Sequence, residues 1–457
     1  MTELTCFKAY DIRGRLGDNL DEGIVHRIGR AFAEVTKART VVVGRDCRAS
    51  SQSLLDALCE GLMEGGTDVL DLGLCGTEEV YFATTHLGVD GGLEVTASHN
   101  PMDYNGIKMV LGESKPLGNH NGMAEIKAMA SSAAFPPSTQ MGARAPVTCR
   151  DAYAQRVIGF CDLSKLRPLK IVVNAGNGTA GPTFDAIADG LAAAGAPLTF
   201  IRHHHTPDGT FPNGIPNPLL EENRPLTADV VRAHGADLGV AWDGDFDRCF
   251  FFDETGAFID GEYIVGLLAA SFLDKEAGAR IVHDPRITWN TIDLVTSQGG
   301  EPIQSRTGHA FLKQIMREKN AVYGGEMSAH HYFRDFMFCD SGMIPWVLVV
   351  ELMGSTGQPL SALVADRQAK FPSSGEINFR LADAKAAIAD VVAQFEGTAV
   401  TRDDTDGISL EFPNWRFNLR SSNTEPVVRL NAESRGDRAL LDQKVAQISA
   451  ILETHAG

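Results

Sequence analysis

Segments with the pattern of a strand and segments with the pattern of a helix alternate three times up to residue 371, and this order constrains the fold more than any other feature. Such an alternation predicts parallel or mixed sheets that are covered by helices. The helix expected at 50–63 illustrates the pattern, because Leu54, Leu58 and Leu62 fall on one stripe. The other elements expected here are a strand that ends just before Ser98, strands at 40–43, 69–72, 169–173, 198–201, 238–242, 280–282 and 321–323, and helices at 78–87, 184–194 and 262–273.

The composition changes at two places along the chain. Residues 131–138 (SSAAFPPS) are small and include prolines, which predicts a loop at a domain boundary. Beyond residue 371 the strands become short, which predicts a smaller α+β domain. Its expected strands are 377–379, 408–412, 417–419 and 427–430, and its expected helices are 384–395 and 440–452. A chain of 457 residues is long enough for two to four domains of about 100–200 residues each.

The charge balance restricts the class of partner. The chain has 59 acidic and 41 basic side chains, a net charge of -18, whereas a protein that binds nucleic acid presents a basic face. We therefore expect no nucleic-acid partner. If the substrate is itself an anion, small clusters of Arg and Lys, together with a metal ion, must overcome the general repulsion.

The sequence also bears on the compartment. The N-terminal residues lack the pattern of an export signal. The longest apolar run, 343–353, contains Pro345 and Glu351 and is too short to span a bilayer. Eight cysteines without a C-x-x-C pair suit reduced thiols. We expect a cytoplasmic protein with no membrane partner.

A serine on a tight loop is the first candidate for chemistry. Residues 96–101 (TASHNP) follow directly after the apolar segment 91–95, so Ser98 is placed where a strand ends. A hydroxyl in such a loop can act as a nucleophile that carries a phosphoryl group. A serine beside a histidine is weak evidence alone, so other residues must support this interpretation.

The second candidate is the acidic segment 243–248 (DGDFDR), whose three carboxylates alternate along the chain. Carboxylate oxygens of this kind suit Mg²⁺. An EF-hand calcium loop is the competing interpretation, since Glu254 falls at its twelfth position, but Arg248 stands where that loop needs glycine. A solvated acidic turn is the other alternative, and it is disfavoured because strands that look buried flank the segment.

A glycine-rich segment supports a rival function. Residues 176–181 (GNGTAG) match the G-x-G-x-x-G pattern of dinucleotide-binding enzymes between a strand and a helix. That signature requires an acidic residue about 20 positions further on, and the segment 200–205 (FIRHHH) contains none. An NADP enzyme that uses Arg202 remains open, but a plain strand-to-helix turn is preferred. The three histidines are interpreted as a polar loop rather than a metal site.

Three later segments carry groups that bind sugars and phosphates. The segment 325–331 (GEMSAHH) offers a carboxylate, a hydroxyl and imidazoles, although a core or capping histidine explains part of it equally well. His309 in the segment 307–309 could supply an acid or base. The segment 420–426 (RSSNTEP) joins a guanidinium to short donors that can bind a phosphate dianion, with a serine-rich turn as the alternative.

In this order and spacing, the four loops at 96–101, 243–248, 325–328 and 420–426 resemble those of the α-D-phosphohexomutases along essentially the full chain, and most closely the bacterial phosphomannomutase branch. The resemblance implies an α/β protein. Three similar α/β domains with mixed sheets and a C-terminal α+β domain, folded like the TATA-binding protein, would surround a central cleft. The expected domains are 1–145 for the phosphoserine, 146–252 for the metal, 253–366 for the sugar and 367–457 for the phosphate.

The resemblance also implies roles for individual residues. Ser98 would be phosphorylated, and Asp243, Asp245 and Asp247 would bind Mg²⁺ together with an oxygen of the Ser98 phosphate. Glu326 and Ser328 would hold sugar hydroxyls, while the phosphate that is not transferred would contact Arg420, Ser422, Asn423 and Thr424. The residues that match positive or acid–base positions are Tyr10, Arg13, Lys108, Arg248, His309 and His330. Arg286 stands where many relatives have a lysine, so it is the one departure among the expected substrate contacts.

The implied activity is the interconversion of mannose 6-phosphate and mannose 1-phosphate, through phosphoserine and a hexose 1,6-bisphosphate that also serves as activator. The product would feed GDP-mannose synthesis, and the expected assembly is a monomer or homodimer. A mutase that accepts both mannose and glucose phosphates is the alternative. A sugar-phosphate-binding protein without catalysis is a third class, and it would not need an activated serine beside a metal site.

Overall fold

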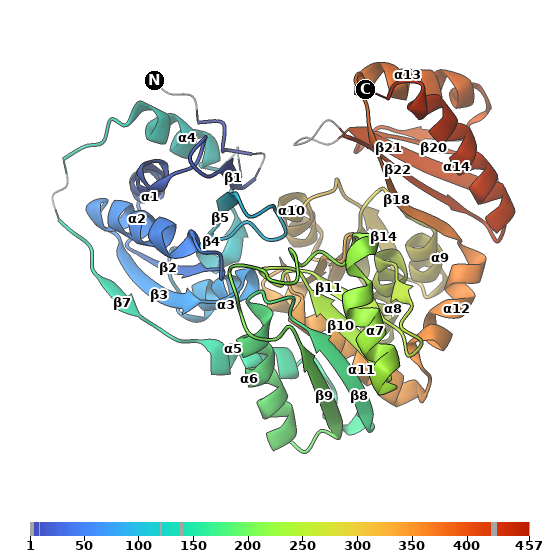
Figure 1. Ribbon diagram of the computed structural model, residues 1–457, viewed down its shortest axis with the longest axis horizontal. Helices are drawn as coiled ribbons and strands as arrows, with labels where there is room; N and C mark the ends of the chain where they lie inside the picture. The colour runs from blue at the N-terminus through green and yellow to red at the C-terminus, as the bar shows by residue number, and fades with distance from the viewer. Residues whose placement is uncertain (1–3, 9, 119–120, 138–139, 422–426, 457) are drawn as a thin grey trace. The chain divides into compact units, whose positions relative to one another are not determined.

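The computed structural model describes residues 4–8, 10–118, 121–137, 140–421 and 427–456. The chain divides into two compact units. Unit 1 contains residues 1–258 and 330–357, and unit 2 contains residues 259–329 and 358–457. Each unit is built from helices packed on sheets (Figure 1).

The first sheet of unit 1 is mixed, as the alternation of elements predicts. Its described strands run in the order β1-β5-β4-β2-β3-β7, with β6 paired to β5. Strand β5 pairs antiparallel with both β1 and β4, whereas β4, β2, β3 and β7 pair parallel with one another in that order. Their bounds are β1 Ile12–Arg15, β2 Thr40–Arg45, β3 Asp68–Leu74, β4 Gly91–Val95, β5 Tyr104–Leu111, β6 Lys115–Pro116 and β7 Arg144–Pro146.

The helices of this part are α1 Glu22–Thr36, α2 Ser51–Glu64, α3 Thr77–His86 and α4 Met123–Ser132. Helices α1 and α2 pack closely because a glycine in each faces the backbone of the other. A Cβ atom on Gly61 of α2 would lie 2.0 Å from the carbonyl oxygen of His26 in α1. A Cβ atom on Gly29 of α1 would lie 2.4 Å from the carbonyl oxygen of Leu58. Only glycine allows these backbones to approach so closely.

The second sheet of unit 1 carries the acidic loop at the end of a buried strand. Strands β10, β8 and β9 are parallel, and β11 returns antiparallel to β10. Residues 243–248 connect β10 to β11, and every residue of both strands is buried. The elements are β8 Leu169–Asn174, β9 Leu198–His203, β10 Leu238–Trp242, β11 Cys249–Phe252, β12 Phe258–Ile259, α5 Arg150–Ile158, α6 Ala180–Ala193, α7 Pro225–His234 and α11 Met343–Thr356. Two further strands of unit 1, β16 His331–Phe333 and β17 Cys339–Asp340, form an antiparallel pair.

Unit 2 begins with a parallel arrangement in which β14 and β15 both pair with β13. Its elements are β13 Arg280–His283, β14 Glu301–Gln304, β15 Tyr323–Gly325, α8 Gly261–Lys275, α9 Trp289–Ser297, α10 His309–Lys319 and α12 Leu360–Lys370. The carboxylate of Glu433, from the C-terminal sheet, caps the N-terminus of helix α9, because it accepts the backbone N–H groups of Thr288 and Trp289.

The C-terminal sheet is antiparallel throughout its described strands, in the order β18-β22-β21-β20-β19. Alternate residues of an antiparallel strand face opposite sides, and here one side is apolar. Residues such as Phe417, Val428 and Leu430 form a core with the helices α13 and α14, which cover one face (Figure 1). The bounds are β18 Ser373–Arg380, β19 Thr401–Asp403, β20 Ile408–Glu411, β21 Trp415–Ser421, β22 Val427–Ser434, α13 Ala384–Phe395 and α14 Arg438–Glu453. The arrangement is the smaller α+β domain that the sequence predicts, while its likeness to the TATA-binding protein stays a prediction.

Most expected elements are confirmed, and the differences have local causes. The strand expected at 321–323 begins only at Tyr323, and the helix expected at 184–194 begins at Ala180. The prediction of a polar loop at 203–205 is wrong for His203, which ends β9 beside Asn174. The loop expected at 131–138 starts later, because α4 continues to Ser132.

No single helix of the described residues has the length and hydropathy needed to cross a bilayer.

A buried carboxyl joins the N-terminal ends of two helices in unit 1. Glu78, in the first turn of α3, is fully buried and accepts backbone N–H groups from Gly342 at 2.9 Å and Met343 at 3.1 Å at the start of α11. Burial raises the pKa of Glu78 to about 8, although these hydrogen bonds oppose the shift. The folded protein therefore holds a proton here that the unfolded chain releases.

This shift predicts a pH-dependent stability. Because the folded pKa is raised, the contribution of Glu78 to stability is fully present below its ordinary pKa of 4.5 and is lost as pH rises through about 8. Glu78→Gln does not titrate. The difference between the Tm of the variant and the Tm of the unmodified protein should therefore shift in favour of the variant as pH rises from 5 to 8. Calorimetry across this range checks the effect, with exposed Glu125→Gln as control. A Tm difference that stays constant with pH would contradict it.

Candidate active site

The loop after β4 holds Ser98 in an unusual backbone conformation. Its φ is +49°, in the left-handed region that side chains other than glycine seldom adopt. Local hydrogen bonds stabilise it, because the backbone N–H of Ser98 donates to Thr96 Oγ1 at 2.9 Å. The buried guanidinium of Arg48 donates to the carbonyl oxygens of Ser98 and Asn100. The hydroxyl is thereby fixed in place, and such strain is typical of functional loops.

The structure brings Ser98 together with the acidic loop, 145 residues further along the chain. Ser98 Oγ donates to Asp243 Oδ2 at 2.7 Å and lies 3.0 Å from His99 Nδ1. Arg248 Nε donates to the same Asp243 oxygen at 2.8 Å, and its Nη2 lies 3.5 Å from Ser98 Oγ. A hydroxyl, a carboxylate and a guanidinium therefore meet at one point.

The three aspartates of this loop can hold a divalent cation. Asp243, Asp245 and Asp247 are buried, and each offers a carboxylate oxygen within 4.8 Å of the others. Asp245 Oδ1 is buried and has no hydrogen-bond partner among the described residues. A buried carboxylate oxygen without a donor is costly unless a cation binds it. The donor set of several carboxylate oxygens fits Mg²⁺.

Lys108 on β5 compensates part of this negative charge. Its ammonium group donates to Asp245 Oδ2 at 2.7 Å, to Asp247 and to Thr77 Oγ1. Burial alone would lower the pKa of Lys108, but Asp245 and Asp247 hold it well above its usual value. The side chain therefore stays charged.

The pKa of Asp243 and the pKa of Asp247 are shifted in opposite directions. Burial, together with the charges of Asp247 and Asp245, raises the pKa of Asp243 to about 6, although Arg248 opposes the shift. The pKa of Asp247 is held well below its usual value, because Lys108 and His330 outweigh the effect of its burial.

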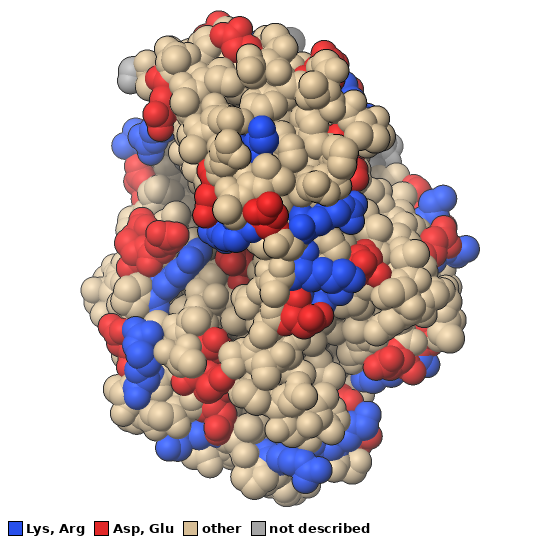
Figure 2. All heavy atoms as spheres, turned by 90° about the vertical axis from the view of Figure 1, so that its right-hand side faces the viewer, with Lys and Arg blue, Asp and Glu red and all other residues tan. Residues whose placement is uncertain are grey.

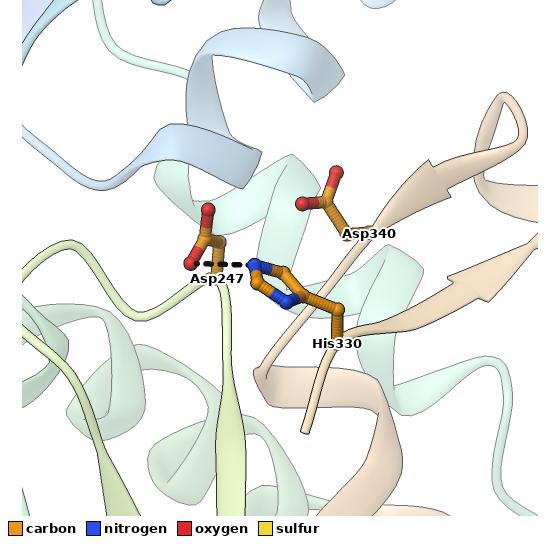
Figure 3. Close-up of side chains that lie close together, drawn as sticks. All are labelled: Asp247, His330 and Asp340. Carbon is orange, nitrogen blue, oxygen red and sulfur yellow. Dashed lines mark ion pairs between the residues drawn. The ribbon is translucent and has the colours of Figure 1, made fainter. Parts of the chain in front are cut away.

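A histidine lies against the last aspartate of the loop (Figure 3). His330 Nε2 is 3.6 Å from Asp247 Oδ1, and the carboxylate of Asp340 from β17 is part of the same group. The imidazole is half-buried, so it can exchange protons while it stays oriented by carboxylates.

The remaining expected residues of unit 1 lie at its first strand. Arg13 on β1 donates to Asn100 Oδ1 in the serine loop at 2.9 Å and to Asp11 at 2.9 Å. Tyr10 is half-buried and lies two residues before the start of the strand. Both belong to the segment that leads into the sheet holding Ser98.

Unit 2 brings together the residues expected to hold the sugar. Arg286 is buried and donates to Asp284 Oδ2 at 2.7 Å and to Ser328 Oγ at 3.2 Å, while Glu326 lies 3.6 Å from the same Nη2 atom. Glu326 also accepts the backbone N–H of Gly308, directly before His309 at the start of α10. Arg286 stands where many relatives have a lysine, and like that lysine it places a positive charge beside Glu326 and Ser328.

The last predicted loop is only partly described. Arg420 lies near the end of β21, with its Nη1 atom 3.6 Å from Asp406 Oδ2 and its Nη2 atom 3.7 Å from Glu376 Oε2. Ser422, Asn423 and Thr424 lie outside the described residues.

Several residues of the site are absent from the sequence prediction. Thr77 and Thr96 donate to Asp245 Oδ2 at 2.9 and 3.1 Å, and Arg48 holds the serine loop. Thr96 lies inside the serine motif, so the sequence contained a signal for it. Thr77 and Arg48 lie in segments with no such signal, and only the fold places them there.

The glycine-rich segment 176–181 supports the acidic loop. A Cβ atom on Gly178 would lie 2.7 Å from the carbonyl oxygen of Gly244, and Thr179 donates its backbone N–H to that oxygen at 3.0 Å. Arg202, which an NADP enzyme would use, donates to Asp185 at 2.7 Å. Gly178 of this motif therefore serves close packing against the acidic loop.

Acidic and basic side chains are mixed on the surface of the protein. Figure 2 shows Lys and Arg side chains interspersed with Asp and Glu over one face of the molecule. The described part of this face carries no continuous basic surface, which agrees with the acidic composition.

A serine hydroxyl beside buried carboxylates at the ends of α/β strands suits an enzyme that transfers a phosphoryl group. Family models for the four domains of phosphoglucomutase/phosphomannomutase match the chain. The α/β/α domain I matches residues 5–136, domain II residues 151–256, domain III residues 260–371 and the C-terminal domain residues 376–451. The chain belongs to the phosphoglucomutase/phosphomannomutase family.

Similar proteins and structures agree with this assignment. A phosphomannomutase of Escherichia coli is 59% identical over 456 residues, which cover 99% of this chain and 100% of that protein. A phosphomannomutase of Vibrio cholerae is 52% identical over 99% of both chains. The crystal structure of a phosphoglucomutase/phosphomannomutase family protein from Burkholderia thailandensis has a TM-score of 0.88 at 33% identity, covering 100% of this chain and 98% of that one.

The contact between the glycine-rich segment and the metal loop can be tested with Gly178→Ala. The added methyl group meets backbone atoms of Gly244 that cannot move independently of the loop, so we expect Mg²⁺ to bind about tenfold more weakly, a typical effect of disturbing groups that support metal ligands. Calorimetric Mg²⁺ titration measures the change.

Gly397→Ala is the matched control, since its added Cβ atom meets nothing within 4 Å. If Gly178→Ala binds Mg²⁺ as well as this control does, the packing interpretation is wrong.

Proposed function

We propose that the chain is a phosphomannomutase that interconverts mannose 6-phosphate and mannose 1-phosphate. The contact of 2.7 Å between Ser98 Oγ and Asp243 Oδ2 carries this proposal, because a phosphoryl group on Ser98 would then lie beside the metal loop. The full-length relatives named phosphomannomutase support the choice of mannose.

The residues of unit 1 provide the phosphoryl donor. Asp243, Asp245 and Asp247 would hold Mg²⁺, and this ion would neutralise negative charge on the transferred phosphoryl group. Lys108 and Arg248 contact those same aspartates and would add positive charge at the reacting oxygens.

The proposed reaction has two half-reactions. In the first, the bond between Ser98 Oγ and phosphorus breaks and a sugar hydroxyl oxygen bonds to phosphorus, which gives a hexose 1,6-bisphosphate. The hydroxyl gives up its proton to a base, and Ser98 Oγ takes up a proton from an acid as it leaves. Lys108, His309 and His330 are the candidate acid–base groups, and Lys108, which stays charged, suits the acid. In the second, Ser98 Oγ loses its proton and bonds to the other phosphorus, the bond between that phosphorus and its sugar oxygen breaks, the sugar oxygen takes up a proton, and the isomeric monophosphate leaves. Free bisphosphate would act as activator by phosphorylating Ser98.

Unit 2 would recognise the substrate. Glu326 and Ser328, with Arg286 beside them, would bind the sugar, and Arg420 with Ser422, Asn423 and Thr424 would bind the phosphate that is not transferred. Tyr10 and Arg13 are further residues that we propose for binding the substrate.

We propose that these roles divide the chain into four domains: residues 1–145 carry the phosphoserine, 146–252 bind the metal, 253–366 bind the sugar and 367–457 bind the phosphate. The proposed setting is the cytoplasm, with small hexose phosphates as partners, a monomer or homodimer as assembly, and GDP-mannose synthesis downstream.

Ser98→Ala tests the covalent step. Without the hydroxyl no phosphoryl group can be carried, so we expect less than about a hundredth of the mutase activity to remain, while the fold is retained. A phosphate mass on a peptide containing Ser98 should be found in the unmodified protein and be absent from the variant.

Ser132→Ala is a matched control, since this serine is exposed on α4. Near-normal turnover of purified Ser98→Ala would refute the covalent role.

The preferred sugar is tested by comparing kcat/KM for mannose 1-phosphate and glucose 1-phosphate, with a trace of bisphosphate activator. We expect a higher value for mannose 1-phosphate. Equal values would instead establish the dual-specificity mutase.

A further inference from the structure

The C-terminal sheet of unit 2 buries an ion pair on the face opposite its apolar core. Arg416 on β21 and Glu433 on β22 are directly opposite each other, and the two strands lie side by side in Figure 1. Arg416 Nη1 donates to Glu433 Oε1 at 2.8 Å, and the two residues are 4% and 0% exposed. A buried ion pair is costly unless further hydrogen bonds satisfy both partners. The partners of this pair therefore indicate what it does.

Arg416 holds the segment between β13 and α9 by its carbonyl oxygens. Its Nη1 donates to the carbonyl oxygen of Arg286 at 2.9 Å, and its Nη2 donates to that of Pro285 at 2.9 Å. The side chain of Arg286 in turn donates to Ser328 Oγ at 3.2 Å and lies 3.6 Å from Glu326 Oε1. Arg416 thus fixes the backbone of the residue whose side chain contacts the groups expected to hold the sugar.

Glu433 holds the other end of the same segment. Its carboxylate accepts the backbone N–H of Thr288 at 2.7 Å and that of Trp289 at 3.1 Å, where α9 begins. A negative charge at the N-terminus of a helix is favourable. The backbone of residues 285–289 is therefore held at both ends by one ion pair.

A second residue on the same face reaches the other segment of the sugar site. Asn431 lies two residues before Glu433 on β22, so both side chains are on one face of the sheet. Asn431 is buried, and its Nδ2 atom lies 3.3 Å from Sδ of Met327. Met327 stands between Glu326 and Ser328. This face of the sheet thus contacts both segments that carry the expected sugar contacts.

The same two strands also lead to the loop that we propose for phosphate binding. Strand β21 ends at Ser421 and β22 begins at Val427, on either side of residues 422–426. Arg416 lies four residues before Arg420 on β21, and such a spacing places both side chains on one face. The sugar and phosphate contacts of unit 2 are therefore built on one pair of strands.

We propose that Arg416 and Glu433 are positioning residues of the sugar site, which act through Arg286. This inference rests on the proposed function, since it takes a hexose phosphate as the ligand. The pair holds the backbone around Arg286 and so sets its guanidinium against Ser328. Because this affects binding rather than the reacting groups of unit 1, loss of the pair should raise KM more than it lowers kcat.

The first test needs no ligand. The double variant Arg416→Gln/Glu433→Gln removes both charges together, so that no buried charge is left unpaired, and it removes the guanidinium that joins two carbonyl oxygens. Hydrogen exchange measured by mass spectrometry should be at least about tenfold faster in a peptide covering 284–290. A peptide covering 243–248 in unit 1 should keep its rate.

The second test measures the Kd for mannose 1-phosphate by calorimetry, in a Ser98→Ala background where no turnover disturbs the equilibrium. The double variant should bind about tenfold more weakly, while its Kd for Mg²⁺ stays unchanged. Arg416→Lys keeps a cation beside Glu433 without the forked geometry, so it should lie between in both tests. It replaces the double variant if that variant does not fold.

Coupling to Arg286 separates positioning from a general structural role. In a chain that already carries Arg286→Gln, the double variant should change the Kd by less than about twofold, because the group that the pair positions is gone. The matched control is Arg402→Gln/Glu396→Gln, which neutralises an exposed pair 2.6 Å long in the same part of the chain. This control should change neither the exchange rate nor the Kd.

Three results would overturn the inference. The first is an exchange rate of 284–290 equal to that of the control, and the second is a Kd within about twofold of the control. The third is the same loss of affinity with and without the Arg286 side chain. Failure of the proposed function would be seen separately, as absence of mutase activity in the unmodified protein, and the exchange rate of 284–290 reports on the positioning in either case.

Discussion

The hydrogen bond between Ser98 and Asp243 is the contact on which the rest of the site depends. It joins two sheets of unit 1, since Ser98 follows β4 and Asp243 follows β10. Both partners are buried, so each must be held by further polar groups. Arg48 holds the serine loop, Lys108 balances the aspartates, and Gly178 lets the backbone of the acidic loop approach.

An acidic chain that acts on anionic substrates must concentrate its positive charge. The net charge is -18, yet Lys108 and Arg248 lie within the carboxylate group of unit 1. In unit 2, Arg286 and Arg420 lie near Glu376. In both units cations lie against carboxylates, which offsets part of the cost of burying either charge.

The fold was largely predictable because its strands and helices have clear periodicity. The strand at 238–242 and the helix at 384–395 match their predicted bounds. Some elements were not predicted, among them the amphipathic helices α7 and α10 and the short strands β16 and β17. The two strands are too short for a local pattern, so only their pairing defines them.

The sequence by itself determined which groups are available, because Ser98 and the aspartates of 243–248 lie in compact motifs whose chemistry can be recognised from neighbouring residues. The tertiary structure decided which distant residues join them. Thr77 reaches Asp245 across 168 positions, and Arg416 meets Glu433 only through the pairing of β21 with β22. No local pattern encodes such contacts, since they arise when separate strands are brought side by side.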